Sequence, residues 1–290
     1  MPRAGFVTVA GRPNAGKSTL LNRIVGQKLS ITSPKPQSTR ERVIGIRTTE
    51  DAQLVLLDTP GLLDPRSALQ RAMRASALRA LDDADVILYL ADATQGVPPP
   101  FTEAARIPSS PAAPMLTVLN KIDALSDGQR QDVQRAMPDA VPISALTGRG
   151  VPALVRMVAE RLPESPWLYP EDEIGTQSLR FFTSELLRET ALEQLDQEVP
   201  YGVACAVEEF REERSPVYIR AVLYVERESQ KGIVIGHGGA RIREIGRAAR
   251  QKVEALVGAP VYLDLRVKVL ANWRKNPAAL RRLGYTLPEG

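Results

Sequence analysis

The segment Gly11-Arg12-Pro13-Asn14-Ala15-Gly16-Lys17-Ser18 fits the pattern G-x-x-x-x-G-K-[ST] of a phosphate-binding loop. An apolar run at 5–10 predicts a strand before it, and the spacing at 17–25 predicts a helix after it, which is the context that the motif requires. Backbone N–H groups at a helix N-terminus attract phosphate oxygens, Lys17 can bridge the outer phosphates, and the Ser18 hydroxyl can bind Mg²⁺. We therefore expect a nucleotide-phosphate site made by Gly11, Asn14, Ala15, Gly16, Lys17, Ser18 and Thr19.

The first half of the chain alternates predicted strands with predicted helices. Apolar runs predict strands at 5–10, 43–48, 54–57, 86–90, 115–119 and 141–143. Helical spacing occurs at 17–25, 67–81 and 151–161. Six prolines within 97–114 leave room for only an abbreviated helix at 101–107. This alternation predicts an α/β domain with a mostly parallel sheet.

A second module is expected after a proline-rich linker, in which Pro163, Pro166 and Pro170 stand among acidic residues. The later pattern predicts a helix at 178–197, strands at 203–209 and 217–226, a glycine cluster, a helix at 240–256, a strand at 261–270 and a final short helix. Such an order is typical of a smaller α+β domain. The predicted divisions are a domain at 1–165, a linker at 166–177 and a second domain at 178–290.

The composition limits the classes of protein to which the chain can belong. A length of 290 residues favours two domains, and 43% hydrophobic with 25% charged residues is ordinary for a globular protein. The single cysteine, Cys205, excludes an internal disulfide or a multi-cysteine zinc site, and we expect it to be a buried strand residue. The single histidine, His237, excludes multi-histidine metal sites. No apolar run approaches about 18 residues and no secretory signal is recognisable, so we expect a cytoplasmic location.

The charge is unevenly distributed along the chain. Residues 1–177 carry 20 Lys+Arg and 19 Asp+Glu, residues 178–230 carry 6 and 11, and residues 231–290 carry 12 and 4, which is a local surplus of +8. A basic block of this kind is typical of a surface that binds a polyanion. A solvated helix surface would give the same count, so charge alone leaves both interpretations open.

Three further segments complete the expected nucleotide site. Asp58-Thr59-Pro60-Gly61 follows the strand at 54–57, where Asp58 can hold Mg²⁺ through water and Gly61 can contact a γ-phosphate, although by itself the segment could be a plain turn. In Asn120-Lys121-Ile122-Asp123, a buried Asp123 carboxylate would accept two hydrogen bonds that guanine donates and adenine cannot. Ser144-Ala145-Leu146 would bring the Ala145 N–H to guanine O6. The expected ligands are therefore GTP and GDP.

With these motifs in order, the first half resembles the Era branch of the translation-factor-related GTPases. Pro36-Gln37-Ser38-Thr39-Arg40 matches the first switch segment of that family. The resemblance implies Thr39 as the second hydroxyl ligand of Mg²⁺, while the spacing itself leaves Ser38 open. We expect Lys17, Thr39 and Gly61 to be the catalytic residues.

Hydrolysis is expected to be slow, because Leu62 stands where many GTPases have a glutamine that orients the attacking water. The resemblance implies a compensating K⁺ ion near the phosphates, held by Asn14. The alternative is that Asn14 only stabilises the loop.

The segment Lys231-Gly232-Ile233-Val234-Ile235-Gly236-His237-Gly238-Gly239 ends in a G-x-x-G loop before a basic helix, which is the signature of a KH domain that binds single-stranded RNA. The loop alone could be a simple turn. Residues 162–172 and 267–274 also match the Era family, so the resemblance spans nearly the whole chain. It implies a type II KH fold for the second module. Expected RNA-binding residues are Lys231, Gly232, Gly236, His237, Gly238, Gly239, Arg241, Arg243 and Arg247.

Two features of this module leave alternatives. His237 stands where the family commonly has a lysine, so it either weakens the attraction to the RNA backbone at neutral pH or has a structural role in the loop. Trp273 and Tyr285 could stack on bases, but packing in the core is the alternative for both.

The resemblance implies a GTP-hydrolysing switch that binds the 3′ region of small-subunit ribosomal RNA and assists 30S subunit assembly, with a peripheral contact at the inner membrane face. We expect a monomer. An RNA-binding assembly protein that uses GTP mainly as a structural ligand is the first alternative. A related GTPase that acts on another RNA, in tRNA modification or at membranes is the second, although it does not explain the G-x-x-G module.

Overall fold

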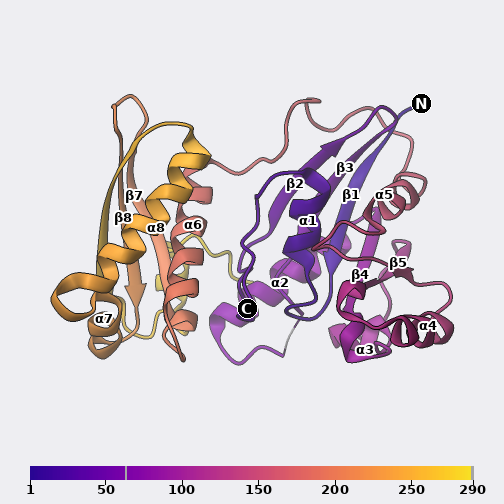
Figure 1. The fold of residues 1–290 in the computed structure, drawn as a ribbon, viewed down its shortest axis with the longest axis horizontal. Helices are drawn as coiled ribbons and strands as arrows, with labels where there is room; N and C mark the ends of the chain where they lie inside the picture. The colour runs from indigo at the N-terminus through magenta and orange to yellow at the C-terminus, as the bar shows by residue number, and fades with distance from the viewer. Residues whose placement is uncertain (63, 289–290) are drawn as a thin grey trace. The chain divides into compact units, whose positions relative to one another are not determined.

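The computed structural model describes residues 1–62 and 64–288, which form two compact units (Figure 1). The first unit contains Met1–Arg66 and Gln70–Thr176, and the second contains Ser67–Leu69 and Gln177–Gly290. None of the helices in the described part of the chain is long and apolar enough to span a membrane.

The first unit is an α/β domain, as predicted. Its strands are β1 (Arg3–Ala10), β2 (Val43–Thr48), β3 (Ala52–Asp58), β4 (Val86–Asp92), β5 (Met115–Asn120) and β6 (Val141–Pro142). They form one sheet in the order β2-β3-β1-β4-β5-β6, in which only the β2–β3 pair is antiparallel. Because parallel strands end at the same edge, the loops after β1, β3, β5 and β6 meet there, and these loops carry the sequence motifs.

Within the described residues of this unit, four α-helices connect these strands and a fifth follows β6. They are α1 (Lys17–Val25), α2 (Ala68–Asp82), α3 (Phe101–Ala105), α4 (Asp127–Ala136) and α5 (Val151–Ala159). The abbreviated helix expected at 101–107 is present as α3. The sequence did not predict α4, because this helix buries no residue and so lacks an apolar stripe; it begins with a capping box between Ser126 and Gln129.

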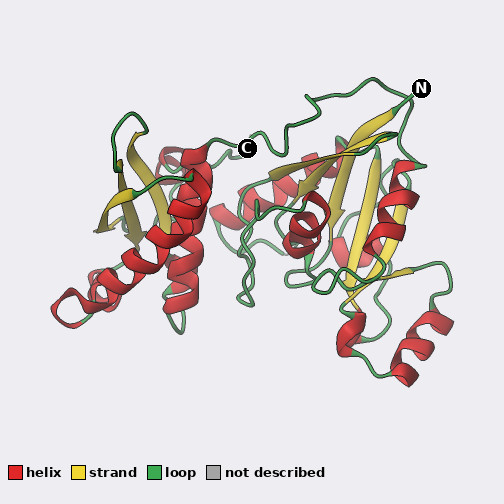
Figure 2. Cartoon of the chain, turned by 45° about the horizontal axis from the view of Figure 1, so that its top comes forward, coloured by secondary structure: helices red, strands yellow, loops and turns green. Residues whose placement is uncertain are grey.

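The second unit has the order α-β-β-α-α-β of a KH domain, formed by α6 (Leu179–Gln194), β7 (Ala204–Arg211), β8 (Val217–Val225), α7 (Glu228–Ile235), α8 (Ala240–Val257) and β9 (Val261–Val269), followed by α9 (Pro277–Arg282). Strand β8 pairs antiparallel with β7 and parallel with β9. Figure 2 shows α6 and α8 on the same face of this sheet. Their apolar residues, including Ala191, Ile245 and Ala249, pack on Leu223 and Ala221.

Gly232, the first glycine of the predicted glycine cluster, lies in helix α7. The Gln230 side chain accepts hydrogen bonds from the backbone N–H groups of Glu226 and Arg227 and so stabilises the helix start. Gly232 lies inside the helix, which ends only at Gly236, whose φ is 72°. Capping and the buried Val234 outweigh the low helix propensity of one glycine.

The segment predicted to be an interdomain linker is hydrogen-bonded to the first unit. The Gln53 side chain accepts from the N–H groups of Leu168 and Tyr169 and donates to the Tyr169 carbonyl, and the Ile46 N–H donates to the Ile174 carbonyl. These bonds attach residues 168–174 to β2 and β3. The exact bounds 1–165, 166–177 and 178–290 stay a prediction.

Candidate functional site

The phosphate-binding loop joins β1 to α1 in a conformation that requires its two glycines. Gly11 has φ 151° and Gly16 has φ 97°. A Cβ atom on Gly11 would lie 2.2 Å from the Leu90 carbonyl oxygen, and one on Gly16 would lie 2.2 Å from Asn120 Nδ2. The loop therefore lies directly against β4 and the last residue of β5, with its N–H groups at the start of α1.

Lys17 is the first residue of α1, and its side chain lies back along the loop. It is only 6% exposed, and its Nζ donates to the carbonyl oxygens of Gly11 at 3.3 Å and Arg12 at 3.1 Å. Burial lowers the pKa of Lys17, and the nearby Asp58 carboxylate counteracts this effect. The ammonium group is thus held inside the loop, where phosphate oxygens would replace the two carbonyl partners.

Three oxygen-bearing side chains from three separate segments meet beside this loop. Ser18 Oγ donates to Asp58 Oδ2 at 2.7 Å, the Ser18 and Thr39 hydroxyls are hydrogen-bonded at 2.9 Å, and Thr39 Oγ1 lies 3.3 Å from Asp58 Oδ2. Burial raises the pKa of Asp58, while Lys17 and the hydroxyl donors act in the opposite direction.

These residues fit Mg²⁺. Asp58 is fully buried, and its Oδ1 has no hydrogen-bond partner within the described residues. Two hydroxyls and a carboxylate are hard oxygen donors of the kind that bind Mg²⁺ together with phosphate oxygens and water. Of the two hydroxyls that the sequence left open, that of Thr39 is hydrogen-bonded to Ser18 Oγ.

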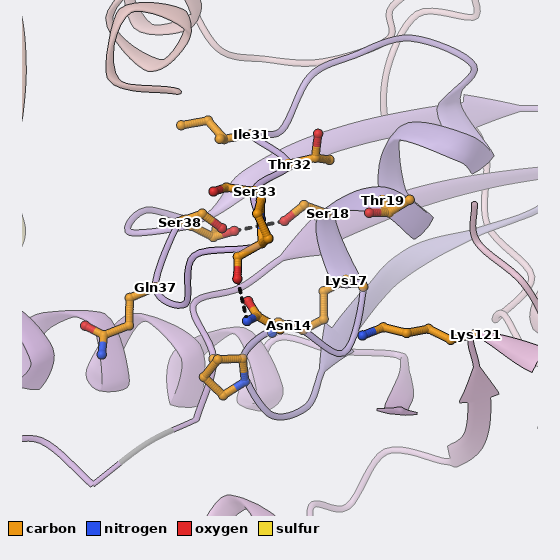
Figure 3. Close-up of a pocket in the computed structure, with 15 residues that line it drawn as sticks. Asn14, Lys17, Ser18, Thr19, Ile31, Thr32, Ser33, Gln37, Ser38 and Lys121 are labelled. Carbon is orange, nitrogen blue, oxygen red and sulfur yellow. Dashed lines mark hydrogen bonds between the residues drawn. The ribbon is translucent and has the colours of Figure 1, made fainter. Parts of the chain in front are cut away.

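A cavity of about 490 Å³ opens in front of these groups (Figure 3). The phosphate loop, residues 31–34 and 37–39, Gly61 and Lys121 line it. Asn14 has φ 62°, and its Nδ2 donates to the Pro34 carbonyl oxygen at 2.9 Å, so the loop is attached to the segment that carries Thr39. A volume of this size is ordinary for a small-molecule site.

The segment after β3 comes very close to the phosphate loop. A Cβ atom on Gly61 would lie 2.8 Å from Pro13 Cγ, so only glycine fits at this approach. The next residue, Leu62, is 3% exposed and belongs to a core cluster with Ala10, Tyr89 and Phe101. Its side chain packs in the core and offers no polar group to a water at the phosphates.

On the side of the site where the guanine base is expected, the Asn120 side chain connects two loops. Its Nδ2 donates to the Ala15 carbonyl oxygen at 2.8 Å, and its Oδ1 accepts from the Ala145 N–H at 2.8 Å. The Ala145 N–H expected to meet guanine O6 is therefore paired with Asn120 in this structure. Ser144 is buried and its Oγ accepts from the Thr147 N–H, which shapes the same loop.

The side chains that would surround a guanine are exposed. Leu146 is 68% exposed. Asp123 is exposed as well, so the expectation of a buried carboxylate does not hold for the chain without nucleotide. Lys121 Nζ donates to Asp92 Oδ2 at 2.7 Å. Burial would raise the pKa of Asp92, but hydrogen bonds from Lys121 and Thr94 lower it overall, so the Asp92 carboxylate is ionised and orients the Lys121 side chain.

Sequence reasoning missed three residues of this site. Ser30 is buried and donates to Asp58 Oδ2 at 2.6 Å. Asn22 on α1 accepts from the N–H groups of Leu29 and Ser30 and donates to the Ser30 carbonyl oxygen, which fixes that serine. Asp92 is the third, as the partner of Lys121. None belongs to a short motif; the only sequence signal was the position of Asp92 at the end of a predicted strand.

The second candidate site is the loop Gly236–Gly239 before α8. Gly236, Gly238 and Gly239 all have positive φ values, of 72°, 54° and 77°, and His237 between them is exposed. Arg243 Nη1 donates to the Gly238 carbonyl oxygen at 2.8 Å. Lys231 and Gly232, which are also expected RNA-binding residues, lie on α7.

A groove of about 410 Å³ lies between α8 and β9, and Arg243, which donates to the Gly238 carbonyl oxygen, is one of its lining residues. Its lining residues are Ile242, Arg243, Gly246, Arg247, Arg250, Tyr262, Leu263 and Leu265. An apolar floor with an arginine rim suits unstacked bases and a phosphate backbone.

Three residues that the sequence left aside have structural roles. Trp273 is fully buried, and its Nε1 donates to the Gly202 carbonyl oxygen at 2.8 Å. Its ring stacks on Tyr285, which is 9% exposed. Cys205 packs beneath α6 with the core of the second unit. The alternative of packing, and not base stacking, is therefore confirmed for Trp273 and Tyr285.

Family models match both units of the chain. A model described as "50S ribosome-binding GTPase" matches residues 6–121, and a model described as "KH domain" matches residues 198–274.

Individual proteins match over nearly the full length. "GTPase Era" of Carboxydothermus hydrogenoformans is 42% identical over 292 residues, covering 98% of each chain, and that of Pseudomonas aeruginosa is 43% identical over 291 residues, covering 98% of this chain and 95% of the relative. A crystal structure of a variant of Aquifex aeolicus Era bound to GDP and AlF₄⁻ superimposes with a TM-score of 0.91 at 38% identity, covering 98% and 100% of the two chains. A structure of Era with MgGDPNP and nucleotides 1506–1542 of 16S ribosomal RNA gives 0.92 at 38% identity, covering 99% and 100%. The chain described here therefore belongs to the Era family of GTPases.

Proposed function

We propose that this GTPase is a molecular switch whose nucleotide state controls how it holds the 3′ region of small-subunit ribosomal RNA during 30S subunit assembly. The observation that carries the proposal is the meeting of Thr39, Ser18 and Asp58 at the phosphate loop. Thr39 belongs to the segment between α1 and β2, and its hydroxyl lies where a metal ion and a γ-phosphate would bind. Loss of the γ-phosphate would remove the partners that hold this segment.

Each residue at the site has a definable task in the proposal. Lys17 and the N–H groups of 14–19 hold the phosphates, and Gly61 approaches the γ-phosphate from the opposite side. Ser18 and Thr39 would be direct ligands of Mg²⁺, and Asp58 would act through water. When bound, Mg²⁺ neutralises the charge that develops on the phosphate oxygens. Asp123, with Lys121 oriented by Asp92, selects guanine.

We further propose that K⁺ stimulates hydrolysis through Asn14. Leu62 is buried in the core and cannot orient a water, so another positive or polar group must assist the reaction. The Asn14 side chain donates a hydrogen bond from Nδ2 to the Pro34 carbonyl oxygen. In the proposal, its Oδ1 is the ligand of the monovalent cation. The rate of phosphate release should be at least severalfold higher in KCl than in NaCl, and Asn14→Ala should remove the difference. Equal rates in the two salts would refute this part.

On the RNA side, the proposal assigns the loop Gly236–Gly239 and the arginine-rimmed groove to the RNA strand. The RNA named for the solved Era relative, together with the match to a KH domain, supports a ribosomal RNA 3′ segment as partner. A monomeric state and a peripheral contact with the inner membrane face are also proposed from the family. Light scattering and vesicle flotation test these two points separately.

The switch is tested by RNA affinity in two nucleotide states. The dissociation constant of the full chain for an oligonucleotide of the 16S RNA 3′ end would be measured in Mg²⁺ with GDPNP and then with GDP. We expect a difference of about tenfold or more, corresponding to about 1.4 kcal/mol of coupling. A scrambled oligonucleotide is the control. Equal affinities in the two states would overturn the switch while leaving RNA binding intact.

A second candidate function is supported by the burial of Leu62. If the active site lacks a group that positions water, the chain could use GTP mainly as a structural ligand for an RNA-binding assembly protein. Phosphate release distinguishes the two functions. Turnover that RNA or K⁺ stimulates favours the switch, and negligible turnover under every condition favours the structural ligand.

A further inference from the structure

The Arg23 side chain on α1 is hydrogen-bonded to the loop that carries Ser144-Ala145-Leu146. Its Nε donates to the Ala145 carbonyl oxygen at 3.1 Å, and its Nη2 donates to the Leu146 carbonyl oxygen. These two partners lie 122 and 123 positions further along the chain. One guanidinium group thus connects the helix that begins at the phosphate loop to the loop that is expected to meet the guanine base.

The two hydrogen bonds fix the backbone on both sides of Leu146. The Leu146 side chain is 68% exposed, so its packing contributes little to holding this residue. Arginine presents its N–H donors in a rigid planar fork, and binding two successive carbonyl oxygens restricts the orientation of two peptide planes. The Arg23 side chain also lies beside Gly148, where a Cβ atom would be 3.7 Å from Arg23 Cδ. Arg23 therefore holds the loop from the side of α1.

Ala145 is held through both of its backbone polar groups. Asn120 Oδ1 accepts from the Ala145 N–H at 2.8 Å, and Arg23 donates to the Ala145 carbonyl oxygen. A guanine O6 that binds the Ala145 N–H would replace Asn120 Oδ1 there or share the N–H with it. The Arg23 hydrogen bonds use carbonyl oxygens, so this exchange leaves them intact and they continue to hold the loop while the base is bound.

A cavity of about 350 Å³ lies beside these hydrogen bonds. Arg23, Ala145 and Leu146 are among its lining residues. Thr19 and Thr32 line this cavity and also the larger one in front of the phosphate loop, so the two cavities are adjacent. Arg23 therefore lies at the border of the nucleotide site and not on a distant surface.

We propose that Arg23 is a positioning residue for guanine recognition, because it fixes the backbone of Ala145 and Leu146 so that an N–H group meets O6. A donor that is already in place binds its acceptor more tightly than a donor in a loop that must first be ordered. Adenine carries an amino group where guanine has O6, so a fixed N–H donor also disfavours adenine. The proposal rests on guanine selection, which is part of the proposed function. The alternative is that Arg23, in the last turn of α1, only complements the helix dipole.

The test compares nucleotides that differ at one position of the base. In 6-thio-GDP a sulfur atom, which is a weak acceptor, replaces O6, whereas IDP keeps O6 and lacks the 2-amino group that would donate to Asp123. The unmodified full chain should bind GDP about tenfold more tightly than 6-thio-GDP. In Arg23→Ala this preference should fall to about twofold or less. The preference for GDP over IDP should be the same in both proteins.

Two further variants separate the geometry of Arg23 from its charge. Arg23→Lys keeps the positive charge but lacks the planar fork, so it should also lose most of the preference for GDP over 6-thio-GDP. Arg156→Ala removes a basic residue from the last turn of α5 and should bind all three nucleotides like the unmodified protein. Thermal unfolding shows whether each variant is folded.

The possible failures are distinguishable. If Arg23→Ala weakens the binding of GDP and 6-thio-GDP by the same factor, or if Arg23→Lys keeps the full preference, the positioning role is refuted. If the unmodified protein binds GDP and 6-thio-GDP equally, there is no O6 contact for Arg23 to support, and the inference fails as well. If the unmodified protein binds ADP as tightly as GDP, guanine selection itself fails, and with it that part of the proposed function.

Discussion

Asp58 is a buried carboxyl group whose pKa burial raises above the ordinary value. A group with a raised pKa in the folded chain contributes stability below its unfolded pKa of about 3.8, and this contribution is lost as the pH rises through the folded value. The buried Asp58 carboxyl group therefore lowers the stability of the protein near neutral pH. The proposed role of the Asp58 carboxylate in binding the metal ion and the nucleotide explains why an aspartate occupies this buried position.

The first prediction compares Asp58→Asn with the unmodified protein in EDTA without nucleotide. The difference in Tm, variant minus unmodified protein, should increase as the pH rises from about 4 to 7. The reason is that the variant has no carboxyl group that could ionise at position 58. Its Mg²⁺-dependent GTP hydrolysis should fall about a hundredfold or more. A constant Tm difference across this pH range would contradict the assignment of a raised pKa.

Cys205 gives a second prediction at this scale. Burial, reinforced by the negative charge of Glu185, raises the pKa of its thiol above the ordinary range. The thiolate is the reactive form, so the native protein should react with a thiol reagent at pH 8 far more slowly than a free cysteine does. The full equivalent should react once denaturant is added. Rapid labelling of the native protein would show that the β7 region opens frequently.

The residues that the sequence predicted are those inside short motifs, and the missed ones act across the chain. Lys17, Ser18 and Asp58 belong to local patterns whose chemistry can be deduced from spacing. Ser30 reaches Asp58 over 28 positions, and Asp92 reaches Lys121 over 29. Only folding brings such pairs together, and the one sequence signal, the position of Asp92 at the end of a predicted strand, does not name Lys121 as its partner.

At the level of elements, the sequence predicted strands better than solvated helices. Strands β3 and β4 are almost entirely buried, so their apolar runs were visible in the sequence. Helix α4 buries no residue, and α7 buries only Val234, so neither shows an apolar period. Both helices begin with side-chain caps, and the capping pattern Ser126-x-x-Gln129 was the one local signal available for α4.

The third prediction tests the helical position of Gly232. A Cβ atom there would meet nothing within 4 Å, so Gly232→Ala should stabilise α7 by about 0.5–1 kcal/mol and leave the RNA affinity unchanged within about twofold. Gly236→Ala is the matched comparison. At Gly236 the φ is 72° and the new Cβ would lie 2.8 Å from Arg241 Cβ, so this variant should lose both stability and RNA affinity. Thermal unfolding and RNA titration check both outcomes.

For the whole molecule, the surplus of +8 over residues 231–290 predicts a strong salt dependence of RNA binding. If Lys231, Arg241, Arg243 and Arg247 each neutralise one phosphate, the slope of log K against log salt should be about −2.8 for a single strand. Affinity should then fall about fiftyfold between 50 and 200 mM salt. Arg247→Gln should reduce the magnitude of the slope by about 0.7. A flat salt dependence would show that the basic residues form an ordinary solvated surface.

The placement of Leu62 also limits how the protein could change. It is packed with Ala10, Tyr89 and Phe101 in the core of the first unit. A glutamine there, which would supply the water-orienting amide of faster GTPases, would instead bury that amide among hydrocarbon side chains and loosen the domain. The position at which a substitution could accelerate GTP hydrolysis is thus also one that stabilises the core of the first unit. Faster GTP hydrolysis would therefore have to evolve through a bound ion or an external activator, because the direct substitution, Leu62→Gln, would destabilise the core.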